Sequence, residues 1–260
     1  MVWRAIARSS TGTSHLKQQL PCQDFGGDRI LGDVLIGAVA DGAGSARYAD
    51  IGAKLAVTTA IDYLAATEAW LQKRHYSWRS LPHPPNEAIM RKIFIKTIHK
   101  ICDRLQTRAT ASGCLVDDLA CTLLTVLATP TWMAAMQIGD GFIVMRSPQS
   151  DYQLLFQPDK GEFANQTTFV TSANVLDDMQ IRILPECPLF ICAASDALER
   201  VAIRLSDWAP FPPFFKPLEE YLTETPNPQQ NDEYLISFLE SERLNQKTDD
   251  DKTLLLCLQC

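Results

Sequence analysis

The sequence of 260 residues contains no apolar run long enough to cross a membrane. Its longest apolar runs, Leu35 to Ala40 and Leu123 to Ala128, have the length of strands, whereas a membrane helix needs about 20 apolar residues. A secretory leader pattern is also missing, because Arg4 and Arg8 interrupt the apolar residues near Met1. These absences argue against a membrane partner and predict a cytoplasmic location.

Basic residues are few, with 24 Lys and Arg against 31 Asp and Glu, for a formal net charge of −7. They form no basic tract, so nucleic acid is not an expected partner. The eight cysteines include one Cys-x-x-C pair, Cys257 and Cys260, but no second pair or nearby His completes a zinc site. Cys121, Cys192 and Cys257 lie in strand-like apolar runs, which predicts packing in the core.

Strand-like and helix-like segments alternate in blocks. Helical periodicity occurs at 46–65, 87–106, 196–204, 214–224 and 231–244. Strand patterns occur at 2–8, 34–40, 120–128, 132–138, 142–146, 152–156, 180–184, 188–194 and 253–258. Asp140-Gly141 predicts a hairpin within a meander of these strands. The blocks favour α+β layers with antiparallel sheets over a doubly wound parallel sheet, and no linker divides residues 1–260, so we expect one domain.

The segment 36–46 reads Ile-Gly-Ala-Val-Ala-Asp-Gly-Ala-Gly-Ser-Ala, in which a buried strand ends on Asp41. Gly42 and Gly44 allow the backbone after Asp41 to bend closely around a divalent cation. Further acids flank other strands, namely Asp24, Asp140, Asp196 and Asp249 to Asp251. Each acid alone could simply be a solvated loop residue. If they converge on one edge, their mutual repulsion requires cations.

Five blocks in order resemble the metal-dependent serine/threonine phosphatases of the protein phosphatase 2C type. They are Cys-Gln-Asp at 22–24, Val-Ala-Asp-Gly-Ala-Gly-Ser at 39–45, Gln-Ile-Gly-Asp-Gly at 137–141, Ala-Ala-Ser-Asp-Ala at 193–197 and Asp-Asp-Lys-Thr-Leu at 250–254. Residues 9–15 and 161–171 look like a bacterial branch of that family. The resemblance spans nearly the whole chain and implies a four-layer αββα sandwich, two antiparallel sheets flanked by helices.

The resemblance also implies a site for two Mn²⁺ or Mg²⁺ ions. Asp41 would bridge both ions, and the carbonyl of Gly42 would bind one of them. Asp196 and Asp250 would hold the other, although Asp251 leaves the register open by one residue. Asp24 would act mainly through metal-bound water.

The chemistry implied by the resemblance is hydrolysis of phosphoserine and phosphothreonine by a metal-bridging hydroxide. The expected partner is a phosphorylated protein, either a cognate serine/threonine kinase or its target. The catalytic acids would be Asp41, Asp24, Asp196 and Asp250. Oxygen ligands suit Mg²⁺ and Mn²⁺, so no Cys or His ligand is required.

The chain departs from the family pattern where the substrate phosphate is held. Family members often carry an Arg five residues before the first Asp, and Gln19 occupies that position. Lys17, His15, Arg4 or Arg8 could replace it, and any of these could equally be an ordinary surface or loop residue. A His that follows Asp-Gly in some members is Ala43 here.

Two further departures concern the second half of the site. The residue after Asp196 is usually Gly and is Ala197 here, which would be strained if the backbone needs a positive φ. A third metal in some relatives uses the acid at Asp140 and an Asp where this chain has Arg200, so a full third site is not expected. A second interpretation therefore stays open, a weakened family member that binds a phosphoprotein or metal without turnover.

Overall fold

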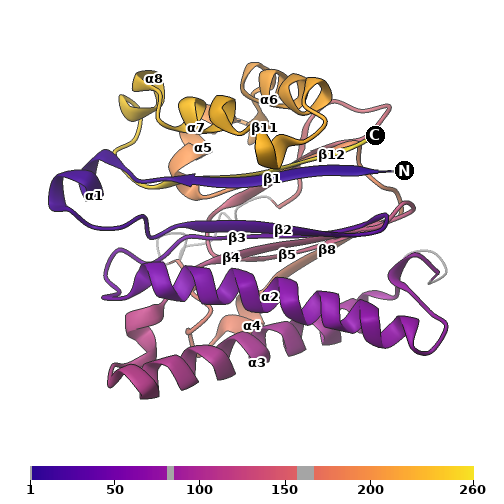
Figure 1. The fold of residues 1–260 in the computed structure, drawn as a ribbon, viewed down its shortest axis with the longest axis horizontal. Helices are drawn as coiled ribbons and strands as arrows, with labels where there is room; N and C mark the ends of the chain where they lie inside the picture. The colour runs from indigo at the N-terminus through magenta and orange to yellow at the C-terminus, as the bar shows by residue number, and fades with distance from the viewer. Residues whose placement is uncertain (1, 81–84, 157–166) are drawn as a thin grey trace.

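The computed structural model describes residues 2–80, 85–156 and 167–260, which form four layers in the order helix, sheet, sheet, helix (Figure 1). One five-stranded sheet has the order β1 (Trp3–Ser10), β12 (Lys252–Gln259), β9 (Phe190–Ala194), β6 (Phe142–Arg146), β7 (Gln153–Leu154). The other has the order β2 (Phe25–Leu31), β3 (Val34–Ala40), β4 (Leu123–Ala128), β5 (Met133–Ile138), β8 (Gln180–Leu184). All neighbouring strands are antiparallel, which confirms the predicted αββα sandwich.

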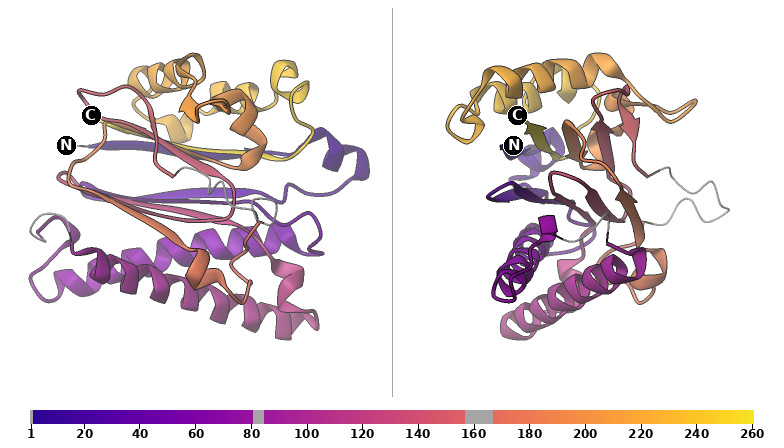
Figure 2. Two further views of the ribbon diagram at one scale, coloured as in Figure 1. Left: turned by 180° about the vertical axis from the view of Figure 1, so that it is seen from behind. Right: turned by 90° about the vertical axis from the view of Figure 1, so that its right-hand side faces the viewer.

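Helices cover the outer face of each sheet (Figure 2). The long helices α2 (Ala49–Gln72) and α3 (Glu87–Ser112) lie against the sheet that contains β3. The opposite sheet is covered by α5 (Glu199–Ala202), α6 (Pro212–Glu224) and α7 (Glu233–Leu239). The remaining elements are short: α1 (Thr13–Gln18), α4 (Val175–Asp178), α8 (Glu242–Asn245), β10 (Ile203–Arg204), β11 (Ala209–Pro210), η1 (Trp78–Ser80), η2 (Val116–Leu119), η3 (Asp196–Leu198) and η4 (Pro228–Gln230).

Three apolar layers hold the sandwich together, and β3 shows why its sequence is continuously apolar. Ile36 and Ala38 face α2 and α3, whereas Leu35 and Val39 face the other sheet. Successive side chains of a strand point to opposite faces, so a strand buried on both faces needs apolar residues throughout. Strand β12 follows the same rule, with Leu255 between the sheets.

The structure corrects one predicted connection. Gly139, Asp140 and Gly141 do not form a hairpin, because β5 belongs to one sheet and β6 to the other. The chain crosses between the sheets at this point, and Gly139 supplies a φ of +93°. Within the segment 152–156, Gln153 and Leu154 form β7, which pairs antiparallel with β6 as the predicted extension requires.

Strand β2 was not expected from the sequence, and its composition explains why. It lies at the edge of its sheet and contains Gly26, Gly27, Asp28 and Arg29. A Cβ at Gly26 would lie 2.9 Å from a methyl group of Thr253, so the glycine allows the two sheets to approach. Tight packing rather than strand propensity therefore decides this element.

The ends of four strands place the candidate acids at one end of the sandwich. Asp41 follows β3, Asp196 follows β9, Asp250 precedes β12, and Asp140 lies between β5 and β6. Helix α1 projects beyond the sheets at this end (Figure 1). Among residues 2–80, 85–156 and 167–260, no helix is long and apolar enough to span a membrane.

Candidate active site

A polar cavity of about 430 Å³ opens between the sheets at the end where the acids gather. Its lining combines carboxylates with small residues, namely Ser14, His15, Gln23, Asp41, Gly42, Ala43, Gly44, Thr122, Asp140, Thr167, Phe169, Asp196, Asp249, Asp250 and Asp251. The segments that contribute these residues are far apart in sequence. Of the acids predicted from the sequence, the cavity brings together Asp41, Asp140, Asp196 and Asp250.

The backbone around Asp41 is fixed by its neighbours. The N–H of Asp41 donates to the Thr122 hydroxyl at 3.0 Å, and the N–H of Thr122 donates to the Asp41 carbonyl at 2.8 Å. The next residue, Gly42, donates its N–H to the Gln23 carbonyl at 3.2 Å. A Cβ on Gly42 would lie 2.7 Å from both that carbonyl oxygen and the Cβ of Ala49, so only glycine fits here.

Asp24 lies deeper than the cavity and is only 4% exposed. No directed hydrogen bond from the described residues reaches either of its carboxylate oxygens. The hydroxyls of Ser195 and Thr253 lie nearby, but Thr253 donates to Ser9 instead. Burial is the main reason that the pKa of Asp24 rises to about 7.

Asp41 connects the buried acid to the cavity. Its carboxyl group lies within interaction distance of those of Asp24 and Asp196. Burial, followed by repulsion from these two carboxylates, raises the pKa of Asp41 to about 11. Burial also raises the pKa of Asp196, with a further contribution from Asp140 and then Asp250. Within the described part of the chain, no basic side chain compensates the charge of Asp24 and Asp41.

A divalent cation fits this group of acids. The orphaned oxygens of Asp24 and the mutual repulsion around Asp41 are costs that a cation removes. The available donors are carboxylates and a backbone carbonyl, the ligands that hard cations such as Mg²⁺ and Mn²⁺ prefer. Asp41, the carbonyl of Gly42, Asp196 and Asp250 can therefore hold metal, with Asp24 behind them.

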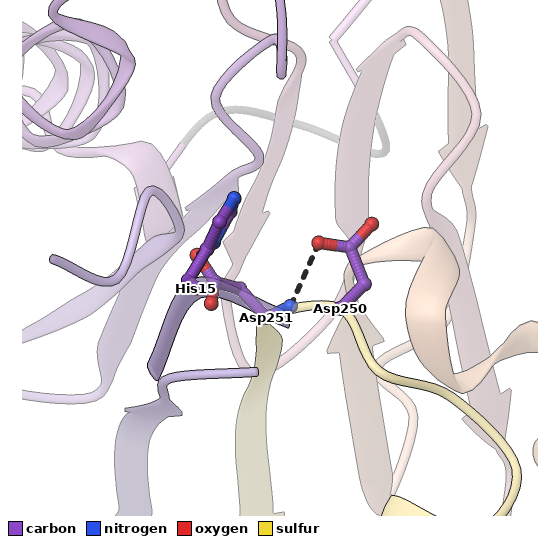
Figure 3. Close-up of side chains that lie close together, drawn as sticks. All are labelled: His15, Asp250 and Asp251. Atoms are coloured by element: carbon purple, nitrogen blue, oxygen red, sulfur yellow. Dashed lines mark hydrogen bonds and ion pairs between the residues drawn. The ribbon is translucent and has the colours of Figure 1, made fainter. Parts of the chain in front are cut away.

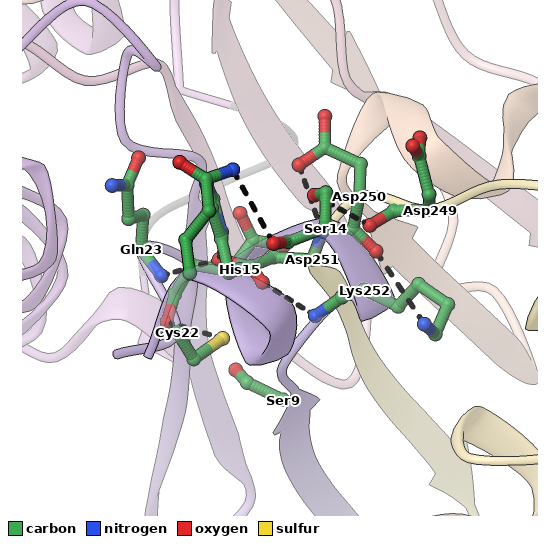
Figure 4. A network of polar contacts seen from close by, with 12 residues as sticks. Ser9, Ser14, His15, Cys22, Gln23, Asp249, Asp250, Asp251 and Lys252 are labelled. Atoms are coloured by element: carbon green, nitrogen blue, oxygen red, sulfur yellow. Dashed lines mark hydrogen bonds and ion pairs between the residues drawn. The ribbon is translucent and has the colours of Figure 1, made fainter. Parts of the chain in front are cut away.

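The structure distinguishes Asp250 from its neighbour Asp251. Asp251 is 3% exposed, and its two oxygens accept the N–H groups of Gly12 at 2.6 Å and Gln23 at 2.5 Å. Asp250 is exposed and lines the cavity. The geometry thus leaves Asp250 available for metal and uses Asp251 to hold two loops (Figure 4).

A family model described as protein phosphatase 2C matches residues 11–240 of the chain. The chain belongs to the protein phosphatase 2C family. It is 34% identical to serine/threonine-protein phosphatase 3 of Escherichia coli (strain K12), a match that covers 99% of each chain. Metal dependence follows from membership of this family.

Solved structures agree on the fold. The serine/threonine phosphatase of S. agalactiae has a TM-score of 0.59 at 16% identity and covers 99% of both chains. The serine/threonine phosphatase of Staphylococcus aureus has a TM-score of 0.60 at 12% identity, covering 100% of this chain and 96% of the other. At these identities the likeness concerns the sandwich itself and not the residues of the site.

Among the described residues of this phosphatase 2C chain, few basic groups reach the cavity. Gln19, at the position of the usual Arg, is an exposed residue with φ of 58° at the end of α1. Arg4 donates to carbonyls of Leu222 and Thr223, and Arg8 pairs with Asp232 at 2.5 Å. Neither arginine lines the cavity, because both face the outer helical layer.

The two remaining candidates lie on α1. Lys17 is exposed and is not among the residues that line the cavity in the described structure. His15 lines the cavity, and its Nδ1 lies 2.9 Å from Oδ2 of Asp251. This contact is close but not directed as a hydrogen bond. His15 is therefore the basic side chain on α1 that the structure brings to the acids.

The backbone around Asp196 and Asp140 shows no strain where the sequence departs from the family pattern. Ala197 lies in η3, and its φ is not positive, so alanine replaces glycine without backbone cost. Asp140 accepts a hydrogen bond from Thr167 at 2.7 Å. Arg200 is exposed, and burial raises the pKa of Glu199 with help from Asp196 and Asp140. The segment 161–166 of the predicted bacterial block lies outside the described residues.

Two residues that build the site, Thr122 and Gly12, were not predicted from the sequence, and Asp251 was predicted only as an alternative to Asp250. Thr122 fixes the end of β3, Asp251 holds two loops, and Gly12 lets the chain pass Asp250. A Cβ on Gly12 would lie 2.3 Å from the backbone carbon of Asp250. Only the Asp-Asp pair at 250–251 gave a signal, and that signal could not tell the two acids apart.

Proposed function

We propose that this protein is a metal-dependent phosphatase that hydrolyses phosphoserine and phosphothreonine in proteins. The supporting observation is the line of uncompensated carboxyl groups from buried Asp24 through Asp41 to Asp196, open to solvent through one cavity. The full-length match to a serine/threonine phosphatase of E. coli supports the same substrate class. Residues 1–260 act as one catalytic domain.

Two Mn²⁺ or Mg²⁺ ions are the proposed cofactors, with Asp41, the Gly42 carbonyl, Asp196 and Asp250 as ligands. When bound, they activate water as the nucleophile and offset the charge that develops on the phosphoryl oxygens. Of these ligands, Asp41 contributes most to metal binding, because its carboxyl group interacts with acids on both sides. Asp24 and Thr122 orient Asp41 from behind and from the side.

The chain's own residues shape how substrate enters. Gly42, Ala43 and Gly44 present no large side chain to the cavity, so a phosphorylated serine on a loop can reach the acids. His15 is the proposed contact for the substrate phosphate, since it borders the cavity beside Asp250. Lys17 stays a prediction for the same role. A serine/threonine kinase or its target is the proposed partner.

The alternative of a binding module without turnover is not favoured. Ala197 carries no backbone strain, and the acids at the ends of the strands are intact. A chain that had lost hydrolysis would not need to keep carboxyl groups at a cost to its own stability.

The test uses the full chain with a phosphoserine peptide and 1 equivalent or more of Mn²⁺ per site. We expect phosphate release that stops with a metal chelator and falls by about 10³-fold or more in Asp41→Asn. Asp103→Asn is the matched control, because Asp103 is an exposed helical residue whose side chain is 71% accessible. Phosphate release that survives both chelation and Asp41→Asn contradicts the proposal.

A further inference from the structure

We infer that Asp251 positions His15 to protonate the leaving oxygen of the phosphorylated serine or threonine. This assignment rests on the phosphatase function proposed above. It gives His15 a chemical step in addition to phosphate contact. It also gives a role to a buried carboxylate that the metal site does not use.

Asp251 is held rigidly and cannot turn toward the metal ligands. The N–H groups of Gly12 and Gln23 donate to its two oxygens at 2.6 and 2.5 Å. A carboxyl group that accepts hydrogen bonds from two backbone N–H groups on different loops is fixed in orientation. Figure 4 shows Asp251 close to Gln23 and His15.

Helix α1 is hydrogen-bonded to the segment that contains Asp251, and these bonds fix the position of His15. Ser14 donates both its N–H, at 2.9 Å, and its hydroxyl, at 2.7 Å, to the carbonyl of Asp249. Gly12 packs against the backbone of Asp250 with no room for a side chain. The helix buries none of its own residues, so these polar contacts are what locates it.

The imidazole of His15 lines the cavity beside Asp251. Its Nδ1 lies 2.9 Å from Oδ2 of Asp251, and the side chain is 14% exposed. Figure 3 shows the other ring nitrogen at the tip of the ring, pointing away from Asp251. An imperfectly directed contact is common in catalytic pairs before substrate binds. A carboxylate behind a histidine holds the proton on the near nitrogen and leaves the far one to exchange protons with substrate.

In the proposed step, the oxygen of the attacking water forms a bond to phosphorus while the bond between phosphorus and the serine Oγ breaks. The electron pair of the broken bond goes to Oγ. The proton on Nε2 of His15 passes to Oγ, which leaves as the hydroxyl of serine. His15 keeps the proton on Nδ1 facing Asp251, and water from the cavity restores the one on Nε2. An alkyl oxygen is a strongly basic leaving group, so it gains from such a donor.

A rival role for His15 is metal binding, because one ligand-type atom from each of His15, Asp250 and Asp251 lies within 4.8 Å of the others. The two backbone donors on Asp251 argue against this role. Two substrates separate the roles. The leaving group of p-nitrophenyl phosphate departs without protonation, whereas a phosphoserine peptide needs a proton donor. A lost metal ligand would impair both.

The experiment measures kcat of the full chain with Mn²⁺ on both substrates. We expect His15→Gln to lower kcat on the phosphoserine peptide by about 10²-fold and on p-nitrophenyl phosphate by less than about threefold. Its affinity for Mn²⁺, measured by calorimetry, should not change. Gln18→Ala, on the exposed face of the same helix, is the matched control and should match the wild type on both substrates.

Adding Asp251→Asn to His15→Gln should not increase the difference between the two substrates beyond that of His15→Gln alone, because the two residues act as a unit in the proton transfer. Equal losses on both substrates for His15→Gln, or a weaker Mn²⁺ affinity, overturn the inference. His15→Asn applies the same criterion if the glutamine variant unfolds. A wild type inactive on both substrates overturns the proposed function and this inference together, whereas equal losses leave the proposed function intact.

Discussion

Asp24 lies behind Asp41, with the two carboxyl groups close enough to repel each other when both are ionised. Asp24 is buried, and within the described residues its oxygens accept no directed hydrogen bond. Ionisation of this pair therefore destabilises the folded protein, and only protonation or a bound cation removes that cost. Several consequences can be measured.

The metal-free protein should lose stability as the pH rises. The folded-state pKa values of Asp24, about 7, and Asp41, about 11, lie above the unfolded value near 3.9. The folded state thus binds more protons, so the free energy of unfolding falls once the pH exceeds about 4, and for Asp24 the fall ends near pH 7. Thermal unfolding in a metal chelator at pH 5.5, 6.5 and 7.5 measures this trend.

Asp24→Asn is the variant that isolates this effect, since an amide does not titrate. Its Tm should depend less on pH than that of the wild type. A wild-type Tm that rises between pH 5.5 and 7.5 in chelator would contradict the assignment of raised pKa values to this pair.

Divalent metal should stabilise the fold, because it binds the acids where folding brings them together and not where they are far apart in the unfolded chain. At a metal concentration 100 times the Kd, one site adds about 2.7 kcal/mol to the free energy of unfolding. Differential scanning fluorimetry with increasing Mn²⁺ should show a rising Tm for the wild type. Asp41→Asn should show little rise, and a rise equal to that of the wild type would argue against Asp41 as the shared ligand.

Gly12→Ala should damage the site more than the fold. The new methyl group would lie 2.3 Å from the backbone of Asp250, so Asp250 or the start of α1 must move. We expect a loss of Mn²⁺ affinity of about tenfold or more, measured by calorimetry. Gly44→Ala is the matched control, because a Cβ there meets nothing within 4 Å. Equal affinities for the two variants would show that this close approach does not position Asp250.

Leu255→Ala should destabilise the sandwich without touching the acids. Leu255 is fully buried between the sheets, where Gly37 makes room for its side chain. Removing it should lower the free energy of unfolding by about 2–5 kcal/mol in denaturant titrations. Ile30→Ala, at a residue 37% exposed on the edge strand, should cost much less. Similar losses at both positions would contradict the importance of the layer between the sheets.

The helices and most strands could be predicted from the sequence because their patterns follow directly from burial. Helix α3 has an apolar stripe. Strand β3 is apolar throughout, and β12 is apolar from Leu254 to Leu258, because both faces of these strands are covered. Strand β2 could not be predicted, because it lacks a strand-like apolar pattern. Its glycines allow close packing, and its charged residues lie on a strand at the edge of the sheet. The connection at Asp140 could not be predicted either, because Gly-Asp-Gly fits a hairpin and a crossing between sheets equally well.

The acids of the candidate site could be predicted from the sequence, but the residues that hold them in position could not. Asp41 and Asp196 each follow an apolar strand, a relationship visible in the sequence. The separate roles of Asp250 and Asp251 depend on backbone donors from residues more than 220 positions away. No local pattern carries that information, and the same is true of the pairing between His15 and Asp251.

Binding of two divalent cations by the acids around Asp41 can be measured by calorimetric titration of the metal-free full chain with Mn²⁺ near pH 7.5. We expect two Mn²⁺ ions per chain for the wild type and the loss of at least one from Asp41→Asn, with Asp103→Asn unchanged. No specific uptake by the wild type, or the same two ions in Asp41→Asn, would contradict this expectation.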